Sequence, residues 1–231
     1  MYREYKISIV IPAHNEEEGL PRVLETLPDY IDEVIVVDSF SSDRTGEIAR
    51  EMGAQVVRED RVGYGRAYKT GFRAVRGDFV VTCDADGTYP VHQIAELLDR
   101  AIGDDLDFLS GSRFPLFDQS AMRRVNHVGN RLMTLAFNFI YLRWVRDILS
   151  GMWVIRTAIL PKLHLISDGW NFSEEIKIEA MLHPSIRFAE HRIEYSERIG
   201  ETKLLPFKVG VENLIFLLKK RGLTLFRRCR S

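Results

Sequence analysis

Short apolar runs alternate with helical patterns through the first half of the chain. Mainly apolar segments of strand length lie at 7–11, 34–37, 55–57, 79–83 and 108–109. Between them, the spacing of apolar residues predicts helices that begin near residues 15, 43, 64 and 90. This alternation predicts an α/β fold, in which a parallel sheet with right-handed crossovers carries helices on both faces.

Polar residues follow three of the predicted strands. Asn15 and Glu16 come after the first strand, Asp38 ends the second, and Asp84 and Asp86 follow the fourth. Because ligands of open α/β sheets bind beyond the carboxyl ends of the strands, these residues mark a candidate nucleotide site. Asn15 is also the expected N-cap of the first helix, since glutamates follow it in the first turn.

Asp84 and Asp86 have the spacing expected of a cation site. Residues two apart on an extended chain share a face, and Gly87 allows the chain to turn away directly afterwards. Two convergent carboxylates favour Mg²⁺ or Mn²⁺, which commonly bind the phosphates of a substrate as well. The alternative is a polar turn in which both carboxylates only cap the helix near Pro90. Their position after a buried strand favours the metal site.

Composition excludes several classes of protein. The 231 residues are 45% hydrophobic and 28% charged, as in a soluble globular domain, and the formal net charge of −1 argues against general nucleic-acid binding. Cys83 and Cys229 are too far apart in sequence to indicate a zinc site or a disulfide framework, so we expect a reducing cytosol. The N-terminus leads into a strand without an apolar signal segment, so we do not expect secretion.

The glycines at 63 and 65 do not form a known dinucleotide-binding motif. Tyr68 stands where the third glycine of such a motif would lie, and the segment follows the third strand rather than the first. The phosphate loop of P-loop ATPases is also missing from the sequence. A dinucleotide-dependent enzyme and a P-loop ATPase are therefore disfavoured, and loop flexibility is the alternative explanation of Gly63 and Gly65.

Four segments taken together resemble a known enzyme family. They are Ser-Ile-Val-Ile-Pro-Ala-His-Asn-Glu-Glu, Val-Ile-Val-Val-Asp-Ser-Phe-Ser-Ser-Asp-Arg-Thr, Gly-Tyr-Gly-Arg-Ala-Tyr-Lys-Thr-Gly-Phe and Cys-Asp-Ala-Asp-Gly. In this order and spacing they resemble family 2 glycosyltransferases of the GT-A fold. Segments at 110–113, 123–124, 147–151, 169–175 and 197–203 are similar to the dolichyl-phosphate mannosyltransferase branch, which includes polyprenyl-phosphate glycosyltransferases.

The resemblance covers nearly the whole chain and implies an organisation and a reaction. We expect one catalytic domain over 1–231, with a nucleotide-binding half at about 6–112, an acceptor half at about 113–205 and an amphipathic basic segment at about 206–231. The implied fold is a Rossmann-like, mostly parallel sheet with a C-terminal helical elaboration that faces a membrane. The implied reaction is the inverting transfer of a hexose from GDP-mannose or a UDP-hexose to a polyprenyl phosphate, with Mg²⁺ or Mn²⁺.

The resemblance also implies site residues. Asp84 and Asp86 would bind the metal. The catalytic residues would be Asp86, Arg113 and Arg198. The nucleotide-binding set would comprise Pro12, Ala13, Asn15, Glu16, Asp38, Gly63, Gly65, Asp84 and Ala85. The acceptor phosphate would contact Arg113, Arg123, His127, Ser150, Arg198 and Lys203.

The chain departs from the pattern of that branch at two positions and in one segment. Thr88 replaces a glutamine that is often a metal ligand, and His127 replaces a serine near the acceptor phosphate. The segment 86–90, Asp-Gly-Thr-Tyr-Pro, is closer to relatives that use other hexoses. The donor sugar therefore stays open.

The second half of the chain carries features expected of a membrane surface. No acidic residue lies between Asp118 and Asp147, and arginines flank an apolar run at 132–145 that is too short to span a bilayer. We expect either a buried or dimer-contact helix, or one in the membrane interface. A basic cluster at 219–230 is either a solvated tail or binds anionic lipid. With the membrane alternatives, we expect peripheral association with the cytoplasmic face of a membrane, and an integral membrane partner is a further candidate.

The acceptor determines the chemistry that is needed. A phosphate monoester is already ionised near neutral pH, so it requires no general base, and arginines would orient it. A sugar or protein hydroxyl would instead need a carboxylate base, for which Glu174 and Glu175 are candidates. A third alternative is a binding protein without turnover, which the pair Asp84 and Asp86 argues against.

Overall fold

The computed structural model describes residues 1–200 and 206–228. The strands are β1 (Ile7–Ala13), β2 (Glu33–Ser39), β3 (Gln55–Glu59), β4 (Phe79–Thr82), β5 (Phe108–Ser112), β6 (Trp153–Arg156) and β7 (Phe188–Arg192). The α-helices are α1 (Leu20–Glu25), α2 (Thr45–Glu51), α3 (Tyr64–Ala74), α4 (Ile94–Gly103), α5 (Arg124–Tyr141), α6 (Phe172–Leu182) and α7 (Pro206–Arg228), and 3₁₀ turns lie at Val91–Gln93 and Thr157–Lys162. The strand–helix alternation predicted for the first half is confirmed.

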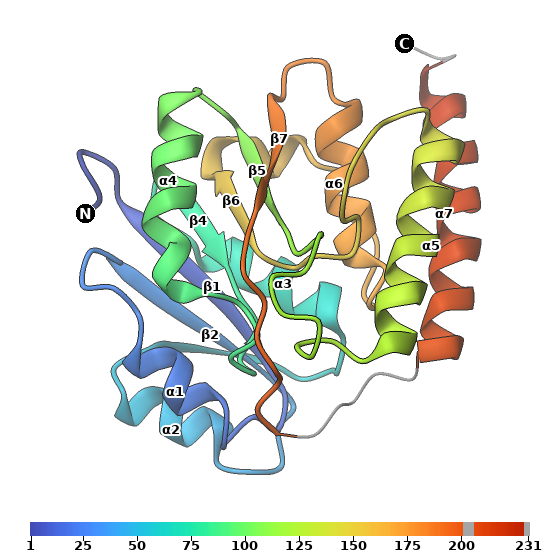
Figure 1. The fold of residues 1–231 in the computed structure, drawn as a ribbon. Helices are drawn as coiled ribbons and strands as arrows, with labels where there is room; N and C mark the ends of the chain where they lie inside the picture. The colour runs from blue at the N-terminus through green and yellow to red at the C-terminus, as the bar shows by residue number, and fades with distance from the viewer. Residues whose placement is uncertain (201–205, 229–231) are drawn as a thin grey trace.

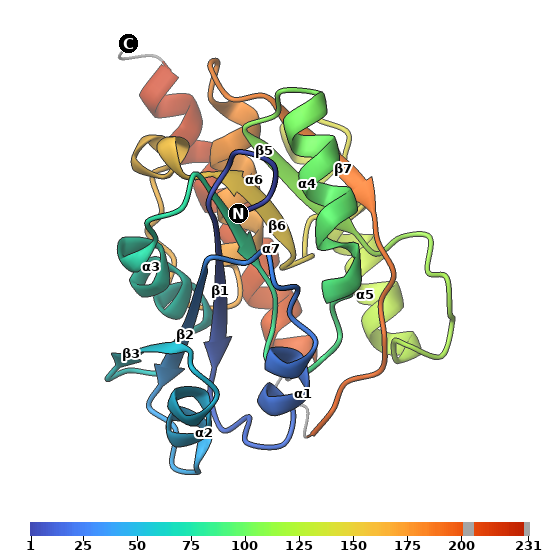
Figure 2. The ribbon, with the colours of Figure 1, turned by 90° about the vertical axis from the view of Figure 1, so that its left-hand side faces the viewer.

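All seven strands join one sheet in the order β3-β2-β1-β4-β6-β5-β7. Neighbouring strands are parallel except β6, which is antiparallel to both β4 and β5. The mostly parallel sheet of the predicted fold class is therefore present. Its parallel part aligns the ends of β1, β2 and β4 at one edge (Figures 1 and 2).

Helices cover both faces of the sheet, as predicted. On one face α1, α2 and α4 bury Leu20, Ala49 and Leu98 against β1 and β4. On the other face α3 and α6 pack aromatic rings, including Tyr68 and Phe172, against the sheet. Figure 2 shows α3 and α4 on opposite sides of the strands. Burial of both faces explains why the central strands read as continuous apolar runs.

The predicted N-cap of the first helix is wrong. Helix α1 begins at Leu20 and follows Gly19, so Asn15 lies outside it. Asn15 adopts a φ of 51°, a left-handed conformation that asparagine tolerates better than most residues. Its side-chain oxygen accepts a hydrogen bond from the backbone of Ser42 at 2.8 Å. Asn15 therefore ties the loop after β1 to the loop after β2.

Helices α5 and α7 lie side by side against α6, at one side of the molecule (Figure 1). Met133 and Phe137 of α5 pack with Leu217 of α7 and Ile178 of α6. The other side of α5 is exposed, so this helix is not buried all round. Within 1–200 and 206–228, no helix is both long and apolar enough to span a bilayer.

Candidate active site

The carboxyl ends of β1, β2 and β4 bring the predicted polar residues together. Asp38 pairs in register with Ala13, and Thr82 of β4 pairs with Val10. Asp84 and Asp86 follow β4 directly, so they extend from the same edge as Glu16 and Asp38. The parallel register thus converts three separate sequence segments into one cluster of carboxylates.

The two carboxylates of the predicted metal pair have different surroundings. The hydroxyls of Tyr64 and Tyr68 lie 3.3 and 3.4 Å from Oδ1 of Asp84. Oδ1 of Asp86 accepts hydrogen bonds from the backbone N–H and the hydroxyl of Thr88, at 3.0 and 2.7 Å. Thr88, the residue that replaces the expected glutamine, therefore orients the carboxylate of Asp86.

A guanidinium lies on the other oxygen of Asp86. Arg198 donates a hydrogen bond to Oδ2 of Asp86 at 2.6 Å and another to Oε1 of Glu16. Arg198 belongs to residues 193–200, which follow β7. Two residues that are 182 positions apart, Glu16 and Arg198, therefore meet at the same point.

The charge and ligand types of this cluster fit a divalent cation. Desolvation raises the pKa of Asp84, and the negative charge of Asp86 raises it further. A bound cation would relieve that cost, because it stabilises the ionised form of both carboxylates. Among the described residues, no group of three or more His, Cys, Asp or Glu side chains could hold a metal. Asp84 and Asp86 stay the predicted ligands, and Mg²⁺ or Mn²⁺ typically completes its shell with water and phosphate oxygens.

The residues predicted to hold the nucleotide line the same edge. Asp38 is buried, and its Oδ1 accepts a hydrogen bond from the backbone of Ser41 at 3.1 Å. Gly46 makes room for this carboxylate, since a Cβ there would lie 2.6 Å from Oδ2 of Asp38. Pro12 and Ala13 form the last residues of β1, and the buried Ala85 lies between Asp84 and Asp86 in the chain.

Gly63 and Gly65 have a packing function in the structure. A Cβ on Gly63 would lie 2.6 Å from the carbonyl oxygen of Asp168, and a Cβ on Gly65 would lie 2.6 Å from the Cβ of Phe172. These glycines let the start of α3 approach the loop before α6. That contact places Tyr64 next to Asp84, so the glycines shape the site through their neighbours.

The predicted acceptor residues occupy different environments. Arg113 is buried and forms a bidentate pair with Asp147, at 2.7 and 2.9 Å. The ring of His127 stacks on Phe114, which also lies beside the guanidinium of Arg113. Arg123 is exposed immediately before α5. The structure therefore brings Arg113 and His127 to one aromatic cluster, with Arg113 held in place by Asp147.

Contacts in the structure say less about two other predicted acceptor residues, Ser150 and Lys203. Ser150 is fully buried, and its hydroxyl has no hydrogen-bond partner within the described part of the chain. Its neighbour Gly151 accepts hydrogen bonds at its carbonyl from Thr82 and Tyr68. Lys203 lies outside the described residues.

Comparison with known proteins assigns the chain to a family. Residues 8–163 match the sequence model of glycosyl transferase family 2. The chain belongs to this family. The glycosyltransferase class predicted from the sequence is thereby confirmed.

Several relatives match most of the chain. The dolichyl-phosphate hexose transferase of Haloferax volcanii is 35% identical over 210 residues, which cover 88% of this chain and 89% of that protein. The low-salt glycan biosynthesis hexosyltransferase Agl6 of the same organism is 36% identical over 92% of this chain. The match covers only about half of Agl6, 53% of its length. Dolichol-phosphate mannosyltransferase of Pyrococcus furiosus is 27% identical, and the match covers 75% of this chain and 53% of the mannosyltransferase. These names support the predicted polyprenyl-phosphate branch of the family.

The fold also matches solved structures. Glucosyl-3-phosphoglycerate synthase from Mycobacterium tuberculosis, crystallised with Mn²⁺, UDP-glucose and phosphoglyceric acid, superposes with a TM-score of 0.76 at 25% identity. The match covers 94% of this chain and 80% of the synthase. Another crystal structure of the same synthase contains Mg²⁺ and UDP. That synthase, which has a similar fold, therefore binds a uridine nucleotide together with a divalent metal.

Neither candidate base of this glycosyltransferase lies free in the site. Glu175 is fully buried, and its Oε2 accepts hydrogen bonds from the backbone of Ile166 and Ser167 at 3.0 and 2.7 Å. Its Oε1 lies 2.7 Å from Nζ of Lys220 on α7. Glu174 is also fully buried, and burial raises its pKa well above the ordinary value. The sequence-based proposal that Glu175 acts as a base conflicts with this structural role.

The tyrosines beside Asp84 were not among the residues predicted from the sequence. Tyr64 and Tyr68 point at this carboxylate, and the hydroxyl of Tyr89 accepts a hydrogen bond from the backbone of Gly151 at 2.6 Å. The spacing of Tyr64 and Tyr68, four apart on α3, places both on one helix face. That spacing was the available signal, but it does not reveal which strand end the face meets.

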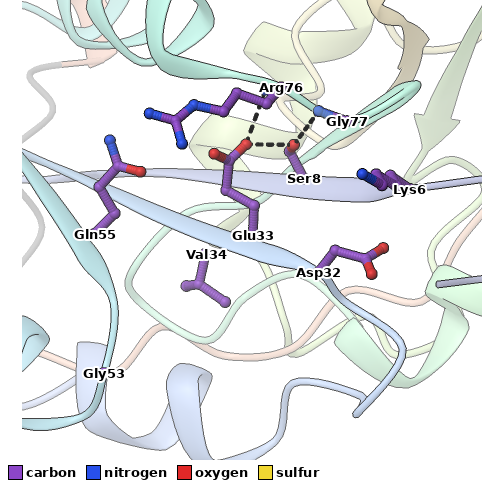
Figure 3. Close-up of a pocket in the computed structure, with 9 residues that line it drawn as sticks. All are labelled: Lys6, Ser8, Asp32, Glu33, Val34, Gly53, Gln55, Arg76 and Gly77. Atoms are coloured by element: carbon purple, nitrogen blue, oxygen red, sulfur yellow. Dashed lines mark hydrogen bonds between the residues drawn. The ribbon is translucent and has the colours of Figure 1, made fainter.

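A separate hollow of about 510 Å³ lies at the opposite end of the sheet, near the start of β1 and β2 (Figure 3). Glu33 there accepts hydrogen bonds from the hydroxyl of Ser8 and the backbone of Arg76, at 2.6 and 2.9 Å. The lining residues are Lys6, Ser8, Asp32, Glu33, Val34, Gly53, Gln55, Arg76 and Gly77. This hollow contains none of the predicted site residues.

Proposed function

We propose that this glycosyltransferase moves a hexose from a nucleoside-diphosphate sugar to a polyprenyl phosphate, with inversion at the anomeric carbon. The similarity to the dolichyl-phosphate hexose transferase, which extends over most of both chains, carries this proposal. The arrangement of the site agrees with it, because carboxylates for a metal are present and both candidate bases are occupied or buried. The chain would act as a single catalytic domain.

The donor would bind at the carboxyl ends of β1, β2 and β4. Asp38 and the end of β1 would hold the base and the ribose, and Asp84 with Asp86 would hold Mg²⁺ or Mn²⁺. The metal would supply Lewis-acid stabilisation of the departing nucleoside diphosphate. A phosphate oxygen of the acceptor would form the new bond to the anomeric carbon while the bond to the diphosphate breaks, which inverts the configuration.

The acceptor phosphate would bind near Arg113 and Arg123. Arg113 cannot swing freely, because Asp147 holds its guanidinium through two hydrogen bonds. Such a fixed guanidinium would orient the lipid phosphate with little loss of conformational entropy. Arg123, which is exposed, would provide the adaptable contact. Ser150 would complete the binding site if its unpaired hydroxyl turned toward the phosphate.

The lipid acceptor requires contact with a membrane, and the exposed side of α5 offers a suitable surface. Apolar residues on this side recur at steps of three and four: Val125, Val128, Leu132, Leu135, Phe139 and Leu142. Phe139 is 83% exposed, and Trp144 beyond the helix is 84% exposed. With arginines nearby and no acidic residue from 119 to 146, this side of α5 complements an anionic surface.

Helix α7 would add to the same contact. Phe207 and Val211 near its start are 82% and 60% exposed. Both α5 and α7 begin at the end of the molecule where β1 and β2 end (Figure 1). A membrane docked on these helices would therefore lie next to the site, as peripheral association on the cytoplasmic face requires. An integral membrane partner could occupy part of the same surface.

A transfer assay tests the proposed reaction. Purified protein is incubated with Mn²⁺, polyprenyl phosphate in liposomes and a panel of GDP- and UDP-hexoses, and the anomeric configuration of the lipid product is determined. We expect one donor to give an inverted product. Arg198→Lys should be severely impaired although it keeps the charge, and Glu175→Gln should act through stability alone. Retained configuration, or full activity of Arg198→Lys with a folded but inactive Glu175→Gln, would contradict the proposal.

A hydroxyl acceptor is the second candidate, because the synthase with the similar fold was crystallised with phosphoglyceric acid. Phosphoglycerate therefore belongs in the same assay as a competing acceptor. Transfer to phosphoglycerate, with none to polyprenyl phosphate, would favour this second reaction.

A further inference from the structure

Arg198 makes contacts that a metal bound at Asp86 would have to replace. Its guanidinium lies 2.6 Å from Oδ2 of Asp86 and also contacts Oε1 of Glu16. The side chains of Asp86 and Glu16 are only 7% and 11% exposed, against 25% for Arg198. Shielding from water strengthens both contacts relative to a surface ion pair.

Only one oxygen of Asp86 is available to an incoming cation. Oδ1 already accepts two hydrogen bonds from Thr88, which orient the carboxylate. Oδ2 is the oxygen that Arg198 contacts. A divalent ion that takes Oδ2 would bring two cationic groups within a few ångströms of each other, and their repulsion would drive the guanidinium away.

The backbone near Arg198 is held independently of its side chain. The N–H of Ile199 donates to the carbonyl of Asp86 at 2.9 Å, and the N–H of Ser196 donates to the carbonyl of Thr88 at 3.0 Å. Gly87 lies beneath this segment at a φ of +75°, and a Cβ there would approach the Ile199 side chain to 2.8 Å. The Arg198 side chain can therefore change partners while the backbone of residues 196–199 stays bound to residues 86–88.

We propose that Arg198 is the resting counter-ion of Asp86, and that Glu16 is a positioning residue that keeps Arg198 at the site after a metal displaces it. This inference rests on the proposed metal and donor site. When metal and diphosphate bind, Asp86 would leave Arg198 for the metal, and the freed guanidinium would turn to the new phosphate charge. Glu16 limits how far the guanidinium moves. The exchange makes metal binding weak until a diphosphate is present.

Mn²⁺ affinity without nucleotide tests the exchange directly. Free Mn²⁺ is measured by electron paramagnetic resonance in titrations of the wild type, Arg198→Ala, Glu16→Gln and the double variant. We expect Arg198→Ala to bind Mn²⁺ about tenfold more tightly, because a competing cation is removed. Arg44→Ala is the matched control, since Arg44 contacts Glu47 rather than the metal pair, and its Mn²⁺ affinity should stay within about twofold of the wild type.

The double variant isolates the part played by Glu16. The substitution Glu16→Gln removes one negative charge whether or not Arg198 is present. When Arg198 is present, the substitution also removes the carboxylate that shares this arginine with Asp86, so Arg198 competes more strongly with Mn²⁺ for Asp86. We therefore expect Glu16→Gln to weaken Mn²⁺ binding at least about threefold more in the wild-type background than in Arg198→Ala. Equal effects in both backgrounds would overturn the role of Glu16.

The transfer assay separates failure of this inference from failure of the proposed function. Suppose that the wild type transfers hexose with Mn²⁺. If Arg198→Ala then binds Mn²⁺ no more tightly than the wild type does, the counter-ion role of Arg198 is overturned and the proposed function is not. Measurable binding by Arg198→Ala, with wild-type binding too weak to detect, supports the counter-ion role. Failure of every variant to bind Mn²⁺, with or without GDP or UDP, overturns both the inference and the proposed metal site.

Discussion

Replacing Lys220 by methionine should strongly destabilise the protein, because this lysine joins α7 to α6. Its Nζ lies 2.7 Å from carboxylate oxygens of both Glu175 and Glu179 and donates to the carbonyl of His164 at 3.1 Å. The side chains of Lys220 and Glu175 are fully buried. Methionine nearly fills the space of lysine, so the substitution removes the charge with little change in packing and leaves Glu175 without a cation.

The expected loss follows from the burial of this cluster. Removing one partner of a buried ion pair costs about 3–5 kcal/mol, because the remaining charge stays away from water. For a chain of this size, each 1 kcal/mol lowers the melting temperature by about 2–4 °C, so the total fall should be about 10 °C. The neighbouring Lys219 is exposed, and Lys219→Met should change the free energy of unfolding by no more than about 0.5 kcal/mol.

Urea unfolding followed by circular dichroism measures both variants under the same conditions. Adding Glu175→Gln to Lys220→Met should recover part of the lost stability, since it removes the uncompensated charge, whereas Glu175→Gln alone should destabilise. A loss below about 1 kcal/mol for Lys220→Met, or an equal loss for Lys219→Met, would refute the structural role of Lys220.

Three other predictions address the metal pair, the buried arginine and the membrane surface. Asp86→Asn should lower Mn²⁺-dependent transfer about 100-fold or more with an unchanged circular dichroism spectrum, and near-normal transfer would exclude Asp86 as a ligand. Burial alone would raise the pKa of Asp147, but the charge and hydrogen bonds of Arg113 outweigh it and hold this pKa below the ordinary value. The stability that Asp147 contributes is therefore complete above its unfolded pKa of about 3.9, and it is lost as the pH falls through the lower folded pKa. The loss of unfolding free energy caused by Asp147→Asn, measured by urea unfolding, should therefore shrink below about pH 4. A loss that does not depend on pH would contradict this. Phe139→Glu should weaken binding to anionic liposomes about tenfold in flotation, with donor binding unchanged, whereas unaltered flotation would exclude this side of α5.

The local patterns in the sequence were sufficient for much of the fold of residues 6–112. Continuous apolar runs predicted β1, β2 and β4 because strands covered on both faces carry few polar residues. Asp84 and Asp86 follow β4 as predicted, although residues 85–86 form a turn there and not the extended chain that the two-residue spacing assumes. By contrast, β7 gave no such signal, because its sequence Phe-Ala-Glu-His-Arg is only half-buried and mixes polar with apolar residues.

The pairing of charges was decided by the tertiary structure. Lys220 was assigned to a basic tail, yet it is fully buried against Glu175, which is 45 residues away. Arg113 was expected to contact the acceptor phosphate, and the sequence did not reveal that Asp147, 34 residues along the chain, holds its guanidinium. Charge type and local spacing are properties of the sequence, whereas a charge's partner depends on which distant segments the topology brings together. Burial depends on the same packing, so a basic run in the sequence does not reveal which of its members reaches solvent.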